Sequence, residues 1–105
     1  MIKSMNATEL KAKLDNKENL VLVDCREQNE WDEGHIKEAI FIALSTFAPA
    51  HGEILTDKKK TVVVQCRSGR RSLTACQLLL AEGFEEIYNL DGGIMAWESN
   101  GFETE

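Results

Sequence analysis

The sequence has little proline, less basic than acidic charge, and no long apolar stretch. Its single proline, Pro49, marks a loop, and no repeat or linker divides the 105 residues, which predicts one domain over residues 1–105. The 12 lysines and arginines against 18 aspartates and glutamates give a net charge of −6, which argues against nucleic acid and against an anionic membrane as partners. Residues 39–50, the longest uncharged apolar stretch, are too few to span a bilayer.

Cysteine is scarce as well, with copies at Cys25, Cys66 and Cys76. An odd number of cysteines, in a chain long enough to fold without disulfides, predicts reduced thiols. There is no C-x-x-C pair and no H-x-x-x-H pair, so we expect no metal site. The N-terminal residues lack the apolar segment of a secretion signal, which favours a cytoplasmic protein. A domain of this size with few exposed apolar runs is expected to be a monomer.

Short apolar runs rich in β-branched residues predict strands. They cover residues 20–23, 40–42, 61–65 and 87–90, with a weak edge strand at 2–5. Because the strongest runs are unbroken and alternate with helical patterns, we expect a parallel sheet covered by helices on both faces. Ligands of such sheets bind beyond the carboxyl ends of the strands. Two of these ends carry candidate chemistry, namely Asp24-Cys25-Arg26 and the loop after Gln65.

Two helices have clear start or stop signals. Residues 6–9 have the form of a capping box, and apolar residues follow at helical spacing. The second helix is expected over about residues 72–82, with Leu73, Cys76 and Leu80 on its apolar face and Gly83 as its stop. Cys76 on that face is interpreted as a core residue.

The loop after the third predicted strand concentrates positive charge around one cysteine. Residues 66–72 read Cys-Arg-Ser-Gly-Arg-Arg-Ser and hold three of the four arginines of the chain. The loop leads into a helix N-terminus, so its N–H groups can turn inward, and Gly69 allows a tight fold. Nearby cations and N–H donors favour thiolate over thiol. This predicts a Cys66 thiolate in a cationic cradle, suited to an anionic substrate that the sulfur attacks.

Four segments in order resemble one family. Residues 23–27 (Val-Asp-Cys-Arg-Glu) are similar to an Asp-Val-Arg element, and residues 31–40 to a Gly-His-Ile…Ala-x-x-Ile element. Residues 66–71, the active-site loop, match a Cys-Arg-x-Gly loop, and residues 90–97 match a closing Gly-Gly…Trp element. These are elements of the single-domain rhodanese (sulfurtransferase) family, and the resemblance covers nearly the whole chain.

The resemblance implies a rhodanese-like α/β fold with a five-stranded parallel sheet and helices on both faces. It also implies transfer of sulfane sulfur from thiosulfate or a similar donor to cyanide or a thiol, through a persulfide on the catalytic Cys66 and without metal or organic cofactor. The residues expected to bind the substrate are Arg67, Ser68, Gly69, Arg70 and Arg71. Of the arginines, Arg67 and Arg71 are expected to hold the sulfonate end, since one of the adjacent pair has to point elsewhere.

The other elements of the resemblance imply supporting roles. Asp24 and Arg26 share a side of an extended segment, and two interpretations stay open for them: bracing of the active-site loop, or a plain salt bridge near it. His35 is interpreted as a loop-ordering side chain rather than a general base. Gly92 and Gly93 would let the chain pass close to the active-site loop before a short last helix.

Three questions stay open at this stage. Cys25 stands where the family has an apolar residue, and it could resolve a Cys66 persulfide into a disulfide or only fill space. A cysteine phosphatase or arsenate reductase is an alternative enzyme, but those families resemble Cys-x5-Arg, and Ser72 occupies that arginine's position here. The other alternative is a sulfur carrier loaded by a partner protein's persulfide, which an intact Cys66 would also serve.

Overall fold

The computed structural model describes residues 1–47, 52 and 55–105, so the loop predicted at Pro49 lies outside the described residues. Five strands form one sheet in the order β1-β5-β4-β2-β3, with every neighbouring pair parallel. The strands are β1 (Ile2–Met5), β2 (Leu20–Asp24), β3 (Ala39–Phe41), β4 (Thr61–Gln65) and β5 (Glu86–Leu90). All five were predicted within one residue at each end, and β1 and β4 have the predicted bounds.

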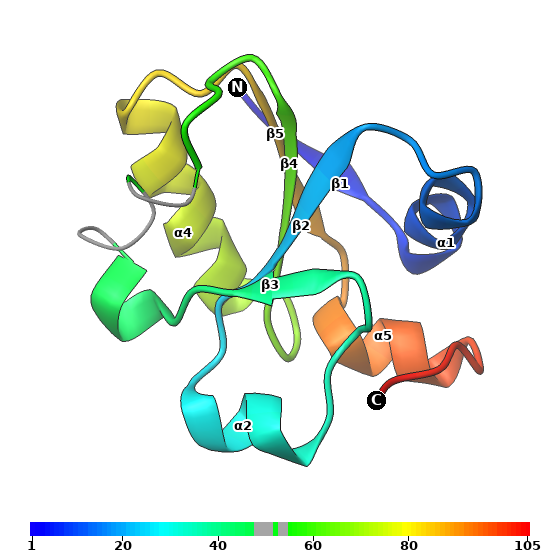
Figure 1. Ribbon diagram of the computed structural model, residues 1–105. Helices are drawn as coiled ribbons and strands as arrows, with labels where there is room; N and C mark the ends of the chain where they lie inside the picture. Colours follow the sequence, from blue (N-terminus) through cyan, green and yellow to red (C-terminus); the bar gives the residue numbers. More distant parts are fainter. Residues whose placement is uncertain (48–51, 53–54) are drawn as a thin grey trace.

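Helices cover both faces of the sheet, as predicted (Figure 1). The helices are α1 (Ala7–Asp15), α2 (Gln28–Glu33), the 3₁₀ helix η1 (Leu44–Thr46), α4 (Arg70–Ala81) and α5 (Gly93–Ser99). One hydrophobic cluster joins α4 to Val23, Val62 and Val64 of the sheet, and the other joins α1 and α5 to Leu22 and Val63. Alternate residues of β2 and β4 therefore enter opposite clusters, as strand geometry requires.

The predicted helix signals are present. Asn6 caps α1 by accepting from the Glu9 N–H at 2.8 Å, and the Glu9 carboxylate accepts from the Asn6 N–H at 3.1 Å. At the end of α4 the Phe84 N–H donates to the Leu79 carbonyl at 3.1 Å, with Gly83 between them in the left-handed region at φ 91°. The start of α1 and the end of α4 therefore have partners for backbone groups that are unpaired within the helices.

The apolar face predicted for α4 was right for Cys76 and wrong for Leu73 and Leu80. The helix begins at Arg70, and its buried residues are Ser72, Ala75, Cys76 and Leu79, whereas Leu73 and Leu80 are 42% and 41% exposed. Small side chains at Ser72 and Ala75 let the helix approach the sheet closely, which turns the two leucines outward. Residue size at the contact, rather than hydrophobicity, sets the rotation of this helix.

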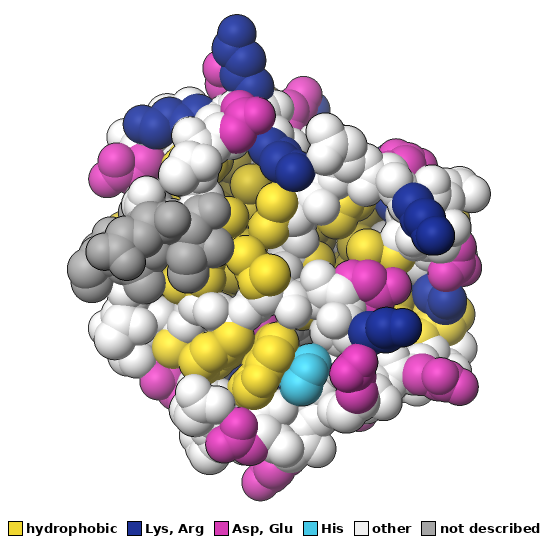
Figure 2. Space-filling model, in the orientation of Figure 1, with side chains coloured by type: hydrophobic (Ala, Val, Ile, Leu, Met, Phe, Trp, Pro, Cys, Tyr) yellow, Lys and Arg dark blue, Asp and Glu magenta, His cyan; other side chains and the backbone are white. Residues whose placement is uncertain are grey.

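The molecular surface is mixed in charge. On the face seen in Figure 2, acidic and basic side chains are interspersed, and no continuous basic area crosses the part drawn in colour. Among the described residues, no helix is long and apolar enough to span a membrane.

Candidate active site

The carboxyl ends of three neighbouring strands converge on one edge of the sheet, and the active-site loop lies there. Residue 66 follows β4 directly, while residues 25–26 follow β2 and residues 91–93 follow β5. The first N–H groups of α5 close on the loop: Ile94 donates to the Cys66 carbonyl at 2.9 Å and Met95 to the Arg67 carbonyl at 3.1 Å. The predicted close passage of residues 92–93 beside the loop is therefore confirmed.

Gly93 makes that close passage possible. A Cβ atom at this position would lie 2.5 Å from the Arg67 carbonyl oxygen and closer still to that of Cys66. The backbone also has φ +56°, in the left-handed region that favours glycine.

Donors surround the sulfur of Cys66, a residue only 1% exposed. The Gly69 N–H donates to Sγ at 3.1 Å, and the Ser72 hydroxyl oxygen lies 3.4 Å from it. The pKa of Cys66 is lowered from its ordinary value to about 4, because the Cys25 thiol and then Ser72 and Gly69 hydrogen-bond to the sulfur, which outweighs the opposing effect of burial. A thiolate at neutral pH follows, in agreement with the prediction from the loop.

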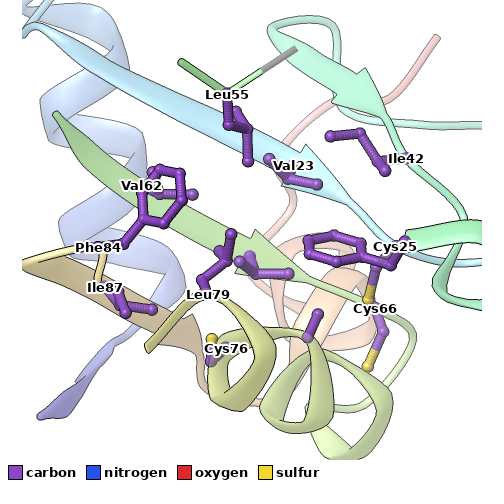
Figure 3. Packing of buried hydrophobic residues seen from close by; sticks show 13 residues of the cluster. Val23, Cys25, Ile42, Leu55, Val62, Cys66, Cys76, Leu79, Phe84 and Ile87 are labelled. Carbon is purple, nitrogen blue, oxygen red and sulfur yellow. The ribbon is translucent and has the colours of Figure 1, made fainter. Parts of the chain in front are cut away.

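Cys25 lies beside Cys66, which the sequence left open. The parallel register of β2 and β4 ends at Asp24 opposite Gln65, and the Cys25 N–H continues the ladder by donating to the Gln65 carbonyl at 2.9 Å. Both cysteines belong to the same hydrophobic cluster and therefore face the same side of the sheet (Figure 3). The hydrogen bond to Cys66 raises the pKa of Cys25, and burial raises it further. Cys25 is thus a thiol next to a thiolate.

Two residues of the site were missed in the sequence. The Ser72 hydroxyl donates to Asn89 Oδ1, and Asn89 Nδ2 donates to the Gly69 carbonyl at 3.0 Å. Asn89 therefore connects Ser72 to Gly69, the two residues that contact the Cys66 sulfur. In the sequence analysis, Ser72 mattered only because it occupies the position of the arginine in Cys-x5-Arg, and Asn89 was only part of a predicted strand. A polar side chain inside an apolar strand was the one signal that could have indicated Asn89.

The arginines of the loop lie in different environments. Arg71 makes a bidentate ion pair with Glu30 of α2, at 2.6 and 2.8 Å. This pair lowers the pKa of Glu30 to about 2 and raises that of Arg71. Arg67 and Arg70 are exposed, as is Ser68.

A cleft of about 660 Å³ opens beside the active-site loop. Its walls include Arg26 and Arg67, with Glu33 and Glu98 as carboxylates and Met95 as an exposed apolar side chain. Arg67 is thus the loop arginine that faces this space, while the fork of Arg71 is occupied by Glu30.

Asp24 and Arg26 form a buried pair at 2.8 Å, with their side chains 0% and 7% exposed. Arg26 also donates to the Gly34 carbonyl at 2.7 Å. These hydrogen bonds tie the end of β2 to the α2–β3 connection at a wall of the cleft, and among the described residues none of them reaches the backbone of the active-site loop.

His35 lies in that same connection. Its ring stacks on Trp31 at 3.6 Å between centroids, and Nδ1 lies 3.0 Å from the Trp31 carbonyl. Its backbone exchanges two hydrogen bonds with Glu105. These contacts agree with the interpretation of His35 as a loop-ordering side chain.

Known proteins are similar to this chain in sequence and in fold. The family model described as "Rhodanese-like domain" matches residues 6–100. The chain is 42% identical over 97 residues to the Bacillus subtilis protein named "Putative sulfurtransferase YtwF", covering 92% of this chain and 91% of that one. It is 34% identical to the "Thiosulfate sulfurtransferase GlpE" of Pseudoalteromonas translucida, covering 80% and 78%.

Solved structures agree. The rhodanese-like domain of the Alr3790 protein from Anabaena has a TM-score of 0.91 at 26% identity, covering all of this chain and 80% of that one. A rhodanese-related protein from Thermoplasma volcanium has a TM-score of 0.82 at 28% identity, covering 98% and 97%. The resemblance stated from four motifs is confirmed, and the chain belongs to the rhodanese-like sulfurtransferase family.

Proposed function

We propose that this protein transfers sulfane sulfur from thiosulfate to cyanide or a low-molecular-weight thiol, through a persulfide on Cys66. The observation that carries the proposal is the environment of the Cys66 sulfur. The Gly69 N–H at 3.1 Å, the Cys25 thiol and Ser72 hydrogen-bond to this sulfur and favour its thiolate form. The name of the similar Pseudoalteromonas protein supports thiosulfate as the donor.

In the first half-reaction the Cys66 thiolate attacks the outer sulfur of thiosulfate. The bond between that sulfur and the sulfonate sulfur breaks, and sulfite leaves with the bonding electron pair. The product is a Cys66 persulfide whose charge lies on the outer sulfur. Inward N–H groups of the active-site loop stabilise this anion, since fixed donors in a buried site need no reorganisation.

Arg67 is the arginine we assign to the sulfonate end of the donor, with Arg70 as a second exposed cation. Arg67 lines the cleft beside the loop, so its guanidinium can meet a dianion there. The bidentate pair with Glu30 occupies the guanidinium of Arg71, so we do not assign this arginine to the sulfonate; its charge still interacts with the Cys66 sulfur.

In the second half-reaction the acceptor attacks the outer sulfur, and the Cys66 thiolate leaves. Cyanide gives thiocyanate and a thiol gives its own persulfide. A covalent intermediate between two substrates predicts ping-pong kinetics, and neither half needs a cofactor.

The test is sulfite and thiocyanate formation from thiosulfate and cyanide by the wild type, Cys66→Ser and Cys76→Ser. We expect both products from the wild type and from Cys76→Ser, a matched control with a buried thiol, and neither from Cys66→Ser. Absence of sulfite with a folded, reduced wild type would refute thiosulfate as donor. If the same protein then took sulfur from cysteine persulfide, the carrier alternative would replace this proposal.

A further inference from the structure

In the reaction above, the Cys25 thiol supports the Cys66 thiolate but takes part in no bond change. Cys25 is fully buried, and its side chain enters the same hydrophobic cluster as that of Cys66. Its N–H bonds the Gln65 carbonyl at 2.9 Å and its carbonyl accepts from Leu44, so the backbone on both sides of the thiol is fixed. A thiol held this firmly beside a nucleophilic sulfur can react with what that sulfur carries.

We propose that Cys25 is a resolving nucleophile, which attacks the inner sulfur of the Cys66 persulfide, forms a Cys25–Cys66 disulfide and releases hydrosulfide. The inference rests on the proposed function, since it begins from the persulfide. It adds a second outcome for the same intermediate, namely reduction of the sulfane sulfur to sulfide when no external acceptor arrives.

The step balances without a further reagent. The Cys25 sulfur forms a bond to Cys66 Sγ, and the bond between Sγ and the outer sulfur breaks. The outer sulfur leaves with the bonding pair and takes the Cys25 proton, so that it departs as HS⁻. The two cysteine sulfurs are oxidised to a disulfide, and the sulfane sulfur is reduced to sulfide.

The register of the sheet permits this disulfide. The Cys25 N–H to Gln65 carbonyl bond is the one that a parallel ladder makes when residue 25 lies opposite residue 66. Neighbouring strands lie about 4.8 Å apart, which falls within the roughly 4.4–6.8 Å that Cα atoms of a disulfide span. Both side chains face the same side of the sheet (Figure 3), which is the orientation that a disulfide between neighbouring strands requires.

The same geometry directs Cys25 to the inner sulfur. Cys25 approaches Cys66 Sγ from β2, whereas Gly69 and Ser72 contact that atom from the active-site loop and the first turn of α4. The outer sulfur of a persulfide lies in the loop, where an acceptor from solvent can reach it. An external acceptor therefore receives the sulfane sulfur, and Cys25 displaces it.

The charge of the intermediate favours ionisation of Cys25. In the resting enzyme the adjacent Cys66 sulfur is the main cause that raises the pKa of Cys25. In the persulfide the negative charge moves to the outer sulfur, away from Cys25. The thiol then loses its strongest acceptor, and its proton is available to the departing sulfide. Burial keeps Cys25 from other electrophiles, so Cys66 Sγ is its one accessible target.

The experiment follows the fate of the persulfide under anaerobic conditions. Reduced, desalted protein is mixed with thiosulfate without cyanide or thiol, and sulfite, sulfide and intact protein mass are measured. The wild type is expected to release one equivalent each of sulfite and sulfide, then to stop with a mass lower by two hydrogens. Cys25→Ala and Cys25→Val remove a donor to the Cys66 thiolate, so they are expected to release sulfite more slowly than the wild type, to release no sulfide, and to gain the mass of one sulfur. Cys76→Ser, which removes the third buried thiol, is expected to match the wild type.

The outcomes separate this inference from the proposed function. Sulfite release with a stable gain of one sulfur in the wild type would overturn the role of Cys25 and leave the sulfurtransferase intact. Absence of sulfite would refute thiosulfate as donor, and the persulfide would then be made with inorganic polysulfide and followed after desalting. Its decay to the disulfide in the wild type but not in Cys25→Ala would support the inference, and equal persistence in both would overturn it.

Discussion

Cys66 at the end of β4 and Cys76 inside α4 are the same residue type in the same hydrophobic cluster, yet their chemistry differs. They are 1% and 0% exposed. The pKa of Cys66 is lowered to about 4, first through the Cys25 thiol, whereas burial raises the pKa of Cys76 to about 12. Burial alone thus makes an inert thiol, and hydrogen-bond donors make a nucleophile of the other one.

The difference follows from what each segment of backbone offers. Inside α4 the N–H groups are used by carbonyls one turn earlier, and the Cys76 thiol itself donates toward the Tyr88 carbonyl at 3.7 Å. Cys66 precedes the helix, where the first N–H groups have no partner within the helix and turn to the sulfur. The junction of strand and helix, together with the Cys25 thiol after the neighbouring strand, accounts for the contacts that the sulfur receives, rather than the arginine content of the loop.

The largest expected effect is the separation of the two ionisations. The two ionisations should be widely separated in pH, because the pKa is lowered to about 4 at Cys66 and raised to about 12 at Cys76. The ultraviolet absorbance of the Cys66 thiolate is measured as the absorbance of the wild type minus that of Cys66→Ser. This difference should appear around pH 4 and reach its full value well below neutrality. The absorbance of the wild type minus that of Cys76→Ser should show no thiolate at neutral pH. A Cys66 signal that appears only above pH 8 would remove the distinction between the two sites.

The next effect is a loss of stability when α5 can no longer approach the active-site loop. This approach concerns the backbone around Cys66 and not that around Cys76. Gly93→Ala places a Cβ against the carbonyls of Cys66 and Arg67 and should lower the free energy of unfolding by about 3 kcal/mol or more. Gly101→Ala is the matched control: φ is +78°, but nothing lies within 4 Å of its Cβ, so about 1 kcal/mol of backbone strain is expected. Urea unfolding measures the free energy of unfolding of both variants. Equal losses would mean that backbone strain at positive φ, rather than the collision of the Cβ atom with the carbonyls, determines the loss of stability.

A smaller effect concerns the Ser72 hydroxyl, which has one hydrogen for two acceptors, Asn89 Oδ1 and the Cys66 sulfur. Ser72→Ala should raise the pKa of Cys66 by about one unit, ~1.4 kcal/mol, since the thiolate loses a donor. The pKa of Cys76 should not change. Thr74→Ala, on the exposed side of the same helix, is the control for loss of a hydroxyl. An unchanged titration of Cys66 in Ser72→Ala would show that the hydroxyl serves Asn89 alone.

Much of the fold was predictable because apolar runs mark buried strands directly. The helical face of α4 was not, because Leu73 and Leu80 are more hydrophobic than Ser72 and Ala75 but larger at a close contact. Ser72 also has to face Cys66, so the site itself helps to set the rotation of the helix. Helix α2 has no buried residue and no apolar spacing, and it was not predicted.

The candidate site was predictable where its residues are adjacent in sequence. Cys66 and Gly69 belong to one loop, and its composition indicated a thiolate. The contact between Cys25 and Cys66 depends on β2 lying next to β4 in one register, which local patterns do not specify. The Arg71–Glu30 pair likewise joins residues 41 positions apart.

The smallest expected effect tests that pair. The Glu30 pKa of about 2 lies below its ordinary value of about 4.3, so the pair stabilises the folded state fully above that ordinary value and loses this contribution as pH falls through about 2. Since both side chains are a quarter to a third exposed, Glu30→Gln should cost only ~0.5 kcal/mol near neutrality and nothing at the acid limit. Urea unfolding across this range measures the difference, with Glu33→Gln on the same helix as control. A cost that persisted at the acid limit would assign it to the packing of α2, whereas a cost that vanished there would assign it to the Arg71–Glu30 ion pair.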